Sequence, residues 1–152
     1  HLLNRLHDNS IDVCFSYLAT NEISYKCIPY KTDEIIFVTN SQNIQFSNGI
    51  HNGEILHLPI IYSKFMPKSG FDWIHDIFPP HYVFQFTISV IKEIIPFLLQ
   101  YPYYAFLPRK LIEKELKDGL LIEIPLLDYH IPPLQSYIIM KSNAKYNPLD
   151  YF

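Results

Sequence analysis

The sequence predicts an α/β fold with largely parallel sheets, and three observations lead to that class. Short β-branched and aromatic runs alternate with helical patterns along the chain, and this alternation is typical of parallel sheets covered by helices. Hydrophobic residues make up 49% and aromatic residues 16% of the 152 residues, which is enough for a sizeable core. The sequence contains no internal repeat and no Gly/Ser-rich linker. We therefore expect one domain, or two small lobes joined by extended segments.

In the first half of the chain, β-branched and aromatic runs predict strands separated by polar turns. Leu2, Leu3 and Leu6 have helical spacing and predict a helix that ends at the polar triplet 8–10. Asn-Gly pairs at 48–49 and 52–53 mark turns. The predicted strands are 11–17, a strand that runs into Pro29, 34–39 and 58–63.

In the second half, helices and strands alternate more regularly. Helical spacing predicts a helix at 69–78, which ends at a Pro-Pro pair, and an amphipathic helix at 90–99, which Pro96 is expected to kink. A charged helix is predicted at 109–117 and closed by Gly119. The predicted strands are 81–88, 103–108, 120–126 and 135–141, and a further helix is expected to start at 147.

Charge and cysteine content exclude several classes of function. The net charge of −3 gives no basic face, so tight binding of nucleic acid by this segment is not expected. The most apolar window, 90–107, contains Lys92, Glu93 and Pro96, which argues against a membrane helix. Cys14 and Cys27 have no metal or redox spacing and favour a reduced, cytosolic chain. The first residues form no signal peptide and start within a helical pattern, so we expect a fragment of a longer protein.

No spacing typical of a metal site or a catalytic motif is present in the sequence. The 7 His residues form no HExxH or paired-ligand pattern, so no metal is expected. There is no Gly-rich phosphate loop, no Gly-x-Ser-x-Gly and no carboxylate pair with an evident acid/base role. Cys14 is expected to be a small buried group, and a thiol-dependent hydrolase that uses it is the enzyme alternative. We expect no enzymatic activity and no cofactor.

Five stretches taken in order resemble the regulatory part of LysR-type transcriptional regulators. "LLNRLHDNSIDVCF" resembles the family's helix, polar turn and strand, and "DEIIFVTN" resembles the strand that leaves its first lobe. "LHLPIIYS" resembles the start of the second lobe, and "IPPLQSYIIMKSN" resembles the strand that returns to the first. The most distinctive stretch is "TISVIKEIIPFLLQYPYYAFLPRKLIEKELKDGLLIEIPL". It resembles a helix followed by Gly-x-Gly-Ile-Ala-x-Leu-Pro, a charged helix and Gly-x-Leu, with matches at Ala105, Leu107, Pro108, Gly119 and Leu121.

The resemblance implies an effector-binding domain of a bacterial, cytoplasmic regulator. Its fold would be similar to type 2 periplasmic binding proteins, with two Rossmann-like lobes joined by two crossover strands around a cleft. Lobe one would be 1–37 with 127–152, and lobe two 38–126. The helix-turn-helix, the linker helix and the first strand and helix of lobe one would be absent from this chain. DNA would then be bound only through that absent helix-turn-helix, by a homodimer or tetramer. A solute-binding protein of a transport system, which has the same fold, is the alternative.

The sequence departs from this family at its most distinctive stretch. The two glycines of Gly-x-Gly correspond to Tyr101 and Tyr103. Glycine at such a turn permits φ > 0 and leaves space, and tyrosine does neither without cost. We expect either that the two tyrosines narrow the pocket and help to select the effector, or that they fill a gap in a cleft that has lost its usual ligand.

Most candidate site residues lie where predicted strands end or a predicted helix begins, and Tyr103 and Tyr104 lie at the turn that leads into the predicted strand 103–108. Hydroxyl groups at a helix start cap its free N–H groups or help to bind an anion there, and the resemblance places effector contacts at this helix. Loops at the carboxyl ends of strands face the ligand crevice of an α/β sheet. Ordinary capping, a solvated lysine and strand-end packing are the alternative roles. The residues expected to contact the effector, a small organic anion, are Thr87, Ser89, Tyr62, Ser63, Lys64, Phe65, Tyr103, Tyr104, Phe15 and Ser16.

Overall fold

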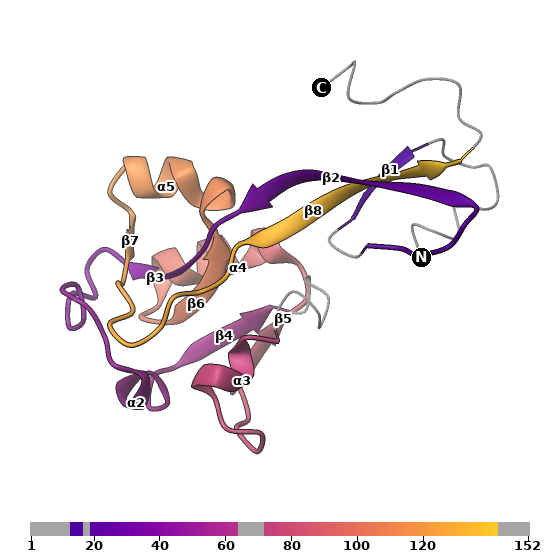
Figure 1. Ribbon diagram of the computed structural model, residues 1–152. Coiled ribbons are helices and arrows are strands. Elements are labelled where there is room, and N and C mark those ends of the chain that lie inside the picture. The colour runs from indigo at the N-terminus through magenta and orange to yellow at the C-terminus, as the bar shows by residue number, and fades with distance from the viewer. Residues whose placement is uncertain (1–12, 17–18, 64–71, 143–152) are drawn as a thin grey trace. The chain divides into compact units, whose positions relative to one another are not determined.

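The structure is a computed structural model that describes residues 13–16, 19–63 and 72–142. The chain forms two compact units (Figure 1), one from residues up to 32 and from 134 onward, the other from 33–133. The predicted helix at 2–6, the helix start at 147 and the site residues Lys64 and Phe65 lie outside the described residues.

The first unit is built on a three-stranded sheet in the order β1-β8-β2. Its strands are β1 (Val13–Ser16), β2 (Tyr25–Asp33) and β8 (Leu134–Lys141). β8 pairs antiparallel with β1, and Cys14 lies opposite Ile139. Cys14, Tyr25 and Ile139 form a small buried cluster, against which Cys27 and Tyr137 pack. Both cysteines are free thiols, and burial raises the pKa of Cys14.

The second unit is built on a five-stranded sheet in the order β5-β4-β6-β3-β7. Its strands are β3 (Ile35–Asn40), β4 (Ile60–Ser63), β5 (Phe86–Ile88), β6 (Tyr104–Pro108) and β7 (Leu121–Glu123). β4 runs parallel to β5 and β6, whereas β3 runs antiparallel to β6 and β7. The prediction of largely parallel sheets is therefore wrong. β3 lies antiparallel between β6 and β7, and a pattern of alternating elements does not reveal such an insertion.

Helices in the second unit vary widely in length. They are α2 (Asn52–Ile55), α3 (Ile74–Ile77), α4 (Ile91–Gln100), the 3-10 helix η2 (Arg109–Ile112) and α5 (Glu113–Lys117). α4 confirms the amphipathic helix predicted at 90–99. The predicted strand 81–88 shortens to β5, and the predicted turn at 52–53 is instead the start of α2.

Two of the predicted turns depend on glycine. Gly49 has φ 130°, and a Cβ there would lie 2.6 Å from a side-chain carbon of Leu127. Gly119 ends α5 with φ 74°. Both φ values lie in the left-handed region that glycine adopts without strain, so both turns confirm the sequence prediction.

The core of the second unit follows the strand alternation. Ile36, Val38, Ala105 and Leu107 are buried in one cluster with Ile94 and Leu98 of α4. The neighbouring residues Phe37, Tyr104 and Phe106 face the other side of the sheet, where the Phe37 ring stacks on Tyr104 and is tilted against Phe106. Burying each large apolar side chain stabilises the fold by roughly 1.5–3 kcal/mol. The sheet is therefore covered by α4 on one face, and Trp73 and Phe78 pack against its aromatic residues on the other.

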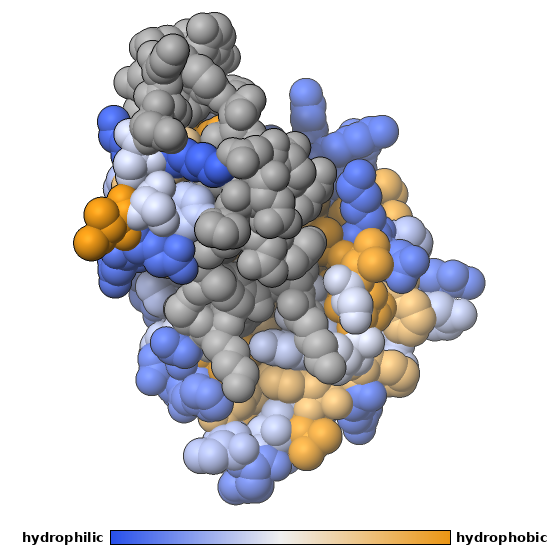
Figure 2. Space-filling view, turned by 90° about the vertical axis from the view of Figure 1, so that its right-hand side faces the viewer, coloured by the Kyte–Doolittle hydropathy of each residue, from blue (hydrophilic) through white to orange (hydrophobic). Residues whose placement is uncertain are grey.

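The surface carries apolar as well as polar side chains. On the face drawn in Figure 2, hydrophobic residues are interspersed with hydrophilic ones. Large apolar side chains that are exposed include Ile23, Ile44, Val83 and Val90, and single exposed residues of this kind are normal. None of the described helices is both long enough and apolar enough to cross a membrane.

Candidate functional site

Four predicted site residues lie together at the end of the five-stranded sheet where β4 and β5 finish. β4 and β5 are parallel, so their carboxyl ends lie at the same end of the sheet. Tyr62 pairs with Thr87 in the register, and Ser63 pairs with Ile88. Ser89 follows directly, two residues before α4 begins. The sequence argument that strand ends bring these side chains together agrees with this geometry.

The four side chains divide between the two faces of the sheet. Ile61 and Ile88 belong to the cluster that packs on α4, and strand alternation places Ser63 on this same face. Ser63 is only 4% exposed. Tyr62 and Thr87 lie on the opposite face, where the Tyr62 ring stacks on Phe84 with centroids 4.9 Å apart. Thr87 and Ser89 are exposed.

The start of α4 lacks a side-chain cap. Its N-cap residue is Val90, which makes no side-chain capping hydrogen bond. The alternative role of Thr87 and Ser89 as plain caps is therefore not seen in the structure. The first N–H groups of a helix have no partner within the helix and carry a partial positive charge. The ten-residue α4 thus presents uncapped N–H groups shortly after the exposed residues Thr87 and Ser89 in the chain.

Tyr103 and Tyr104 do not lie at the carboxyl ends of β4 and β5. Tyr104 pairs with Ile60 at the amino-terminal ends of β6 and β4, which lie at the opposite end of these strands. It is 2% exposed and stacks on Phe37, and burial raises the pKa of Tyr104. The Tyr103 ring contacts Phe86 instead, with centroids 4.9 Å apart. Tyr103 was expected at the pocket because it corresponds to a glycine of the Gly-x-Gly stretch, but this stretch follows the end of α4 rather than its start.

Phe15 and Ser16 end β1 in the first unit. The Phe15 ring lies 5.4 Å from that of Tyr30, measured between centroids. This contact is the packing alternative that the sequence left open. A role for Phe15 and Ser16 in effector binding stays a prediction.

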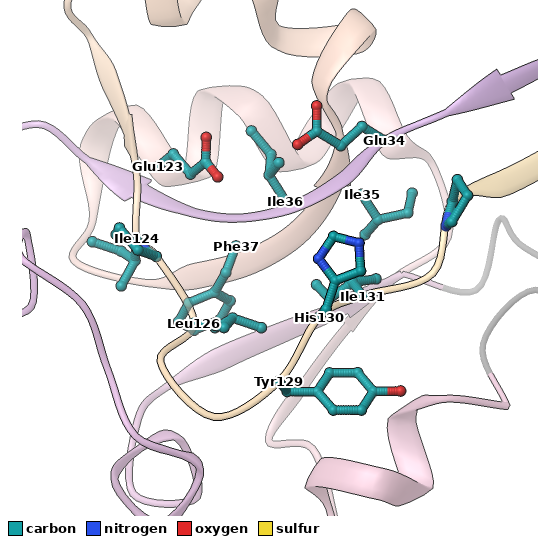
Figure 3. A pocket seen from close by; sticks show the side chains of 12 residues that line it. Glu34, Ile35, Ile36, Phe37, Glu123, Ile124, Leu126, Tyr129, His130 and Ile131 are labelled. Carbon is teal, nitrogen blue, oxygen red and sulfur yellow. The ribbon is translucent and has the colours of Figure 1, made fainter.

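Sequence reasoning missed a pocket of about 400 Å³ in the second unit (Figure 3). It lies beside the start of β3, where the chain after β7 leaves the strand and returns through 124–133. The lining residues are Glu34, Ile35, Ile36, Phe37, Glu123, Ile124, Pro125, Leu126, Tyr129, His130, Ile131 and Pro133. These residues come from two segments far apart in the sequence, and no motif or spacing connects them.

An ion-pair cluster forms one rim of the pocket. The Arg109 guanidinium donates to both carboxylate oxygens of Glu34, at 2.8 and 3.2 Å, and also to Glu123. The hydrogen bond to Arg109 lowers the pKa of Glu34, and the two carboxylates together raise the pKa of Arg109. Since Arg109 begins η2, it ties the starts of β3 and η2 to the end of β7.

The opposite wall is held by a tyrosine. The Tyr129 hydroxyl donates a hydrogen bond to Asp76 at 2.6 Å, which raises the pKa of Tyr129 to about 12. The Tyr129 ring also stacks on Trp73. No group of three or more metal-ligating side chains comes together among the residues that the structure describes.

Comparison with known proteins gives fold matches only. No protein-family model matches the sequence, and no curated protein sequence matches it. The structure is similar to OxyR from Corynebacterium glutamicum, with a TM-score of 0.70 and 19% identity, over 95% of this chain and 47% of that one. This chain thus spans about half the length of that OxyR.

Two isolated regulatory domains give matches of similar quality. The regulatory domain of MetR, a LysR family regulator from N. meningitidis, matches with a TM-score of 0.70 and 13% identity, over 98% of this chain and 72% of that one. The regulatory domain of HypT from Salmonella typhimurium matches with a TM-score of 0.72 and 16% identity, over 99% and 72%. This chain therefore has the α/β fold of LysR-type regulatory domains, which is that of type 2 periplasmic binding proteins.

Proposed function

We propose that this chain is the effector-sensing part of a LysR-type transcriptional regulator. The observation that carries the proposal is the fold match, with TM-scores of 0.70–0.74 over 94–99% of the chain. In the full protein, DNA would be bound by a separate helix-turn-helix in a cytoplasmic homodimer or tetramer. The chain itself would act as a sensor and not as an enzyme.

The proposed effector is a small organic anion bound at the start of α4. Uncapped N–H groups and the hydroxyl groups of Ser89 and Thr87 are the donors that an anion needs. The HypT regulatory domain was solved with a bromide ion bound, so one protein with this fold accepts an anion. Tyr62 and Phe84 provide an aromatic surface nearby for an apolar part of the effector.

Effector binding would act by shifting a conformational equilibrium. A ligand that binds one state of the regulatory domain more tightly raises the population of that state, and the full protein then presents its DNA-binding domains differently. The shift can be no larger than the difference in affinity between the two states.

A thermal-shift screen tests this proposal. Carboxylates, amino acids, phosphate and sulfate are added to the chain, and at least one anion is expected to raise Tm through preferential binding to the folded state. The Ser89→Ala and Thr87→Val variants should bind that anion more weakly. Ser47→Ala and Thr32→Val, at exposed positions elsewhere, should bind it as the unmodified chain does. Stabilisation by neutral compounds alone would contradict an anionic effector.

A DNA-binding assay separates a regulator from a transport protein. The full-length protein is expected to retard a DNA fragment from its own upstream region in a gel, and the anion found in the screen should change that retardation. If the full-length protein carried no DNA-binding domain, the regulator proposal would fall and the solute-binding alternative would replace it.

A further inference from the structure

The geometry points to a second ligand site, in the pocket beside the start of β3, for a small organic cation such as a primary amine attached to an aromatic or branched apolar group. This inference goes beyond the proposed function, because it concerns different residues and the opposite ligand charge. It rests on the size of the pocket, its apolar floor, the charge of its rim and the fixed position of its walls.

The pocket has the size and floor of a small-molecule site. Its volume of about 400 Å³ falls within the roughly 300–1,000 Å³ of typical ligand pockets. Ile35, Phe37 and Ile124, which line it, also belong to the buried core. Leu126 and Ile131 add further apolar surface. A ligand with an apolar body would therefore displace water from these apolar side chains, which favours binding.

The rim of the pocket is negatively charged. Glu34 and Glu123 share a single guanidinium, that of Arg109, so this cluster keeps one net negative charge. Figure 3 shows the two glutamates along one side of the pocket, with His130 between them and Tyr129. Asp76, which accepts a hydrogen bond from the Tyr129 hydroxyl, adds a third carboxylate beyond the opposite wall. A cationic head group is the charge that this arrangement favours.

The β3 backbone supplies further polar groups. The N–H of Ile124 donates to the Phe37 C=O at 2.8 Å, which shows that Phe37 turns its peptide groups towards β7. Ile35 lies two residues earlier and turns its own N–H and C=O to the same side. The β7 pairing extends only as far as Val38 and Glu123. The Ile35 C=O therefore faces the pocket and can accept a hydrogen bond from an amine.

The walls of the pocket are preformed. Arg109 holds Glu34 and Glu123, and the Tyr129 ring is fixed by its hydrogen bond to Asp76 and by stacking on Trp73. A ligand would find these side chains already in place, so little conformational entropy is lost when it binds.

The pocket is separate from the proposed effector site. It lies beside β3 and β7, whereas α4 starts after β5, at the other end of the strand order β5-β4-β6-β3-β7. No residue that lines the pocket belongs to β4, β5 or α4. The two sites can therefore be tested by separate variants.

Calorimetric titration of the full chain with three matched probes tests the inference. Phenethylamine is the cationic probe, phenethyl alcohol the neutral one and phenylacetate the anionic one. Phenethylamine is expected to bind more tightly than both others, and to change the fluorescence of Trp73, the chain's single tryptophan, because this ring stacks on pocket residue Tyr129. Equal binding of the alcohol and the amine, tighter binding of phenylacetate, or no binding of the amine would overturn the inference.

Two variants assign the binding to this pocket. Glu123→Gln keeps the shape of the side chain and removes its charge, and should weaken phenethylamine binding about tenfold. The matched control is Glu113→Gln in α5, an exposed glutamate outside the pocket, which should leave the affinity unchanged. Ile131→Tyr fills the pocket and should abolish binding, and it keeps the test valid if Glu123→Gln fails to fold. Unchanged binding in Ile131→Tyr would place the amine elsewhere.

Discussion

At the scale of single residues, the two tyrosines in the Gly-x-Gly position serve packing. Tyr101 has φ −127° and ψ 154°, an extended conformation that any residue adopts. Its ring lies 4.8 Å from Phe97, and the Tyr103 ring lies 5.1 Å from the same phenylalanine, measured between centroids. Together with Phe86 they form an aromatic cluster at the end of α4. Both tyrosines follow the end of α4, whereas the proposed effector site lies at its start.

Replacing Tyr103 should therefore affect stability rather than effector binding. Tyr103→Ala removes the contacts with Phe86 and Phe97 and is expected to lower the free energy of unfolding by about 2 kcal/mol, since the ring is only partly buried. Urea denaturation measures the loss. Tyr101→Ala, at a ring that is 43% exposed, should cost less. A Tyr103→Ala variant with full stability and weakened affinity for the effector would show that the tyrosine belongs to the binding site after all.

His51 and Asp128 form a pH-dependent contact at the surface. Their side chains lie 3.0 Å apart, and Asp128 also accepts the N–H of Asn52 at 2.9 Å. The hydrogen bond to Asp128 raises the pKa of His51 above its ordinary 6.5. The N–H of Asn52 and the imidazole of His51 lower the pKa of Asp128 below its ordinary 3.8. The contact therefore has its full strength between these two ordinary values.

The stability lost in His51→Gln should depend on pH accordingly. A raised histidine pKa gives stability that is complete below pH 6.5 and is lost as the pH rises through the higher pKa of the folded state. A lowered aspartate pKa gives stability that is complete above pH 3.8 and is lost on further acidification. The Tm difference between the unmodified chain and the variant should thus be largest between these values and shrink above neutrality. His57→Gln, another exposed histidine, is the control. A difference that grows with pH would refute the contact.

At the scale of elements, regular patterns were predicted well and short irregular ones were not. Ile91, Ile94, Ile95 and Leu98 repeat at helical spacing, and α4 buries that face in the core. The apolar runs predicted as strands at 34–39 and 103–108 form β3 and β6, which contribute to the buried core. α2 has only four residues, which is too short for a helical pattern to show, whereas α3 lies within the helix predicted at 69–78. The predicted strand 81–88 alternates over its whole length, but only its last part pairs with β4, because pairing depends on a neighbour that the local sequence does not contain.

The effect of Pro96 on α4 is testable. Pro96 lies inside the helix without ending it and is exposed. It cannot donate a hydrogen bond to the carbonyl four residues earlier, and proline inside a helix costs about 3 kcal/mol. Pro96→Ala restores the donor and should stabilise the chain by about 1 kcal/mol, after allowing for the more flexible unfolded chain. Thermal unfolding measures this.

Pro102→Ala provides the matched control for that measurement. Pro102 is an exposed proline in the connection between α4 and β6, where no helical hydrogen bond is restored. This variant should be neutral or slightly destabilised. If Pro96→Ala lowered Tm as much as Pro102→Ala, the helix would gain nothing from the restored donor.

At the scale of the whole molecule, the resemblance predicted the fold class but composition and spacing did not predict the pocket. The structure divides between 32 and 33 and between 133 and 134, whereas the predicted lobes meet at 37 and 126. Ion pairs of Arg109 with Glu34 and of Lys110 with Asp33 attach the start of β3 to the second unit. Such pairs join residues that are about 75 positions apart, so a reading of local pattern does not reveal them. The identity of the two units as regulatory lobes stays a prediction.

The second unit should fold without the first. Its buried cluster runs from Ile36 to Leu121 and lies wholly within 33–133, a length typical of independent domains. Every residue that lines the pocket also lies within this range. A fragment of residues 33–133 is therefore expected to unfold cooperatively in urea and to bind phenethylamine as the full chain does.

A core variant of that fragment distinguishes a packed domain from a collapsed one. Leu98 is fully buried in the cluster, and Leu98→Ala should lower the free energy of unfolding by about 2–5 kcal/mol. Leu99→Ala, at a side chain that is 36% exposed, should cost much less. A loosely collapsed fragment would show a broad urea transition and respond alike to both substitutions, because only specific packing distinguishes two neighbouring leucines. That result would mean that the second unit needs the rest of the protein to hold its core together.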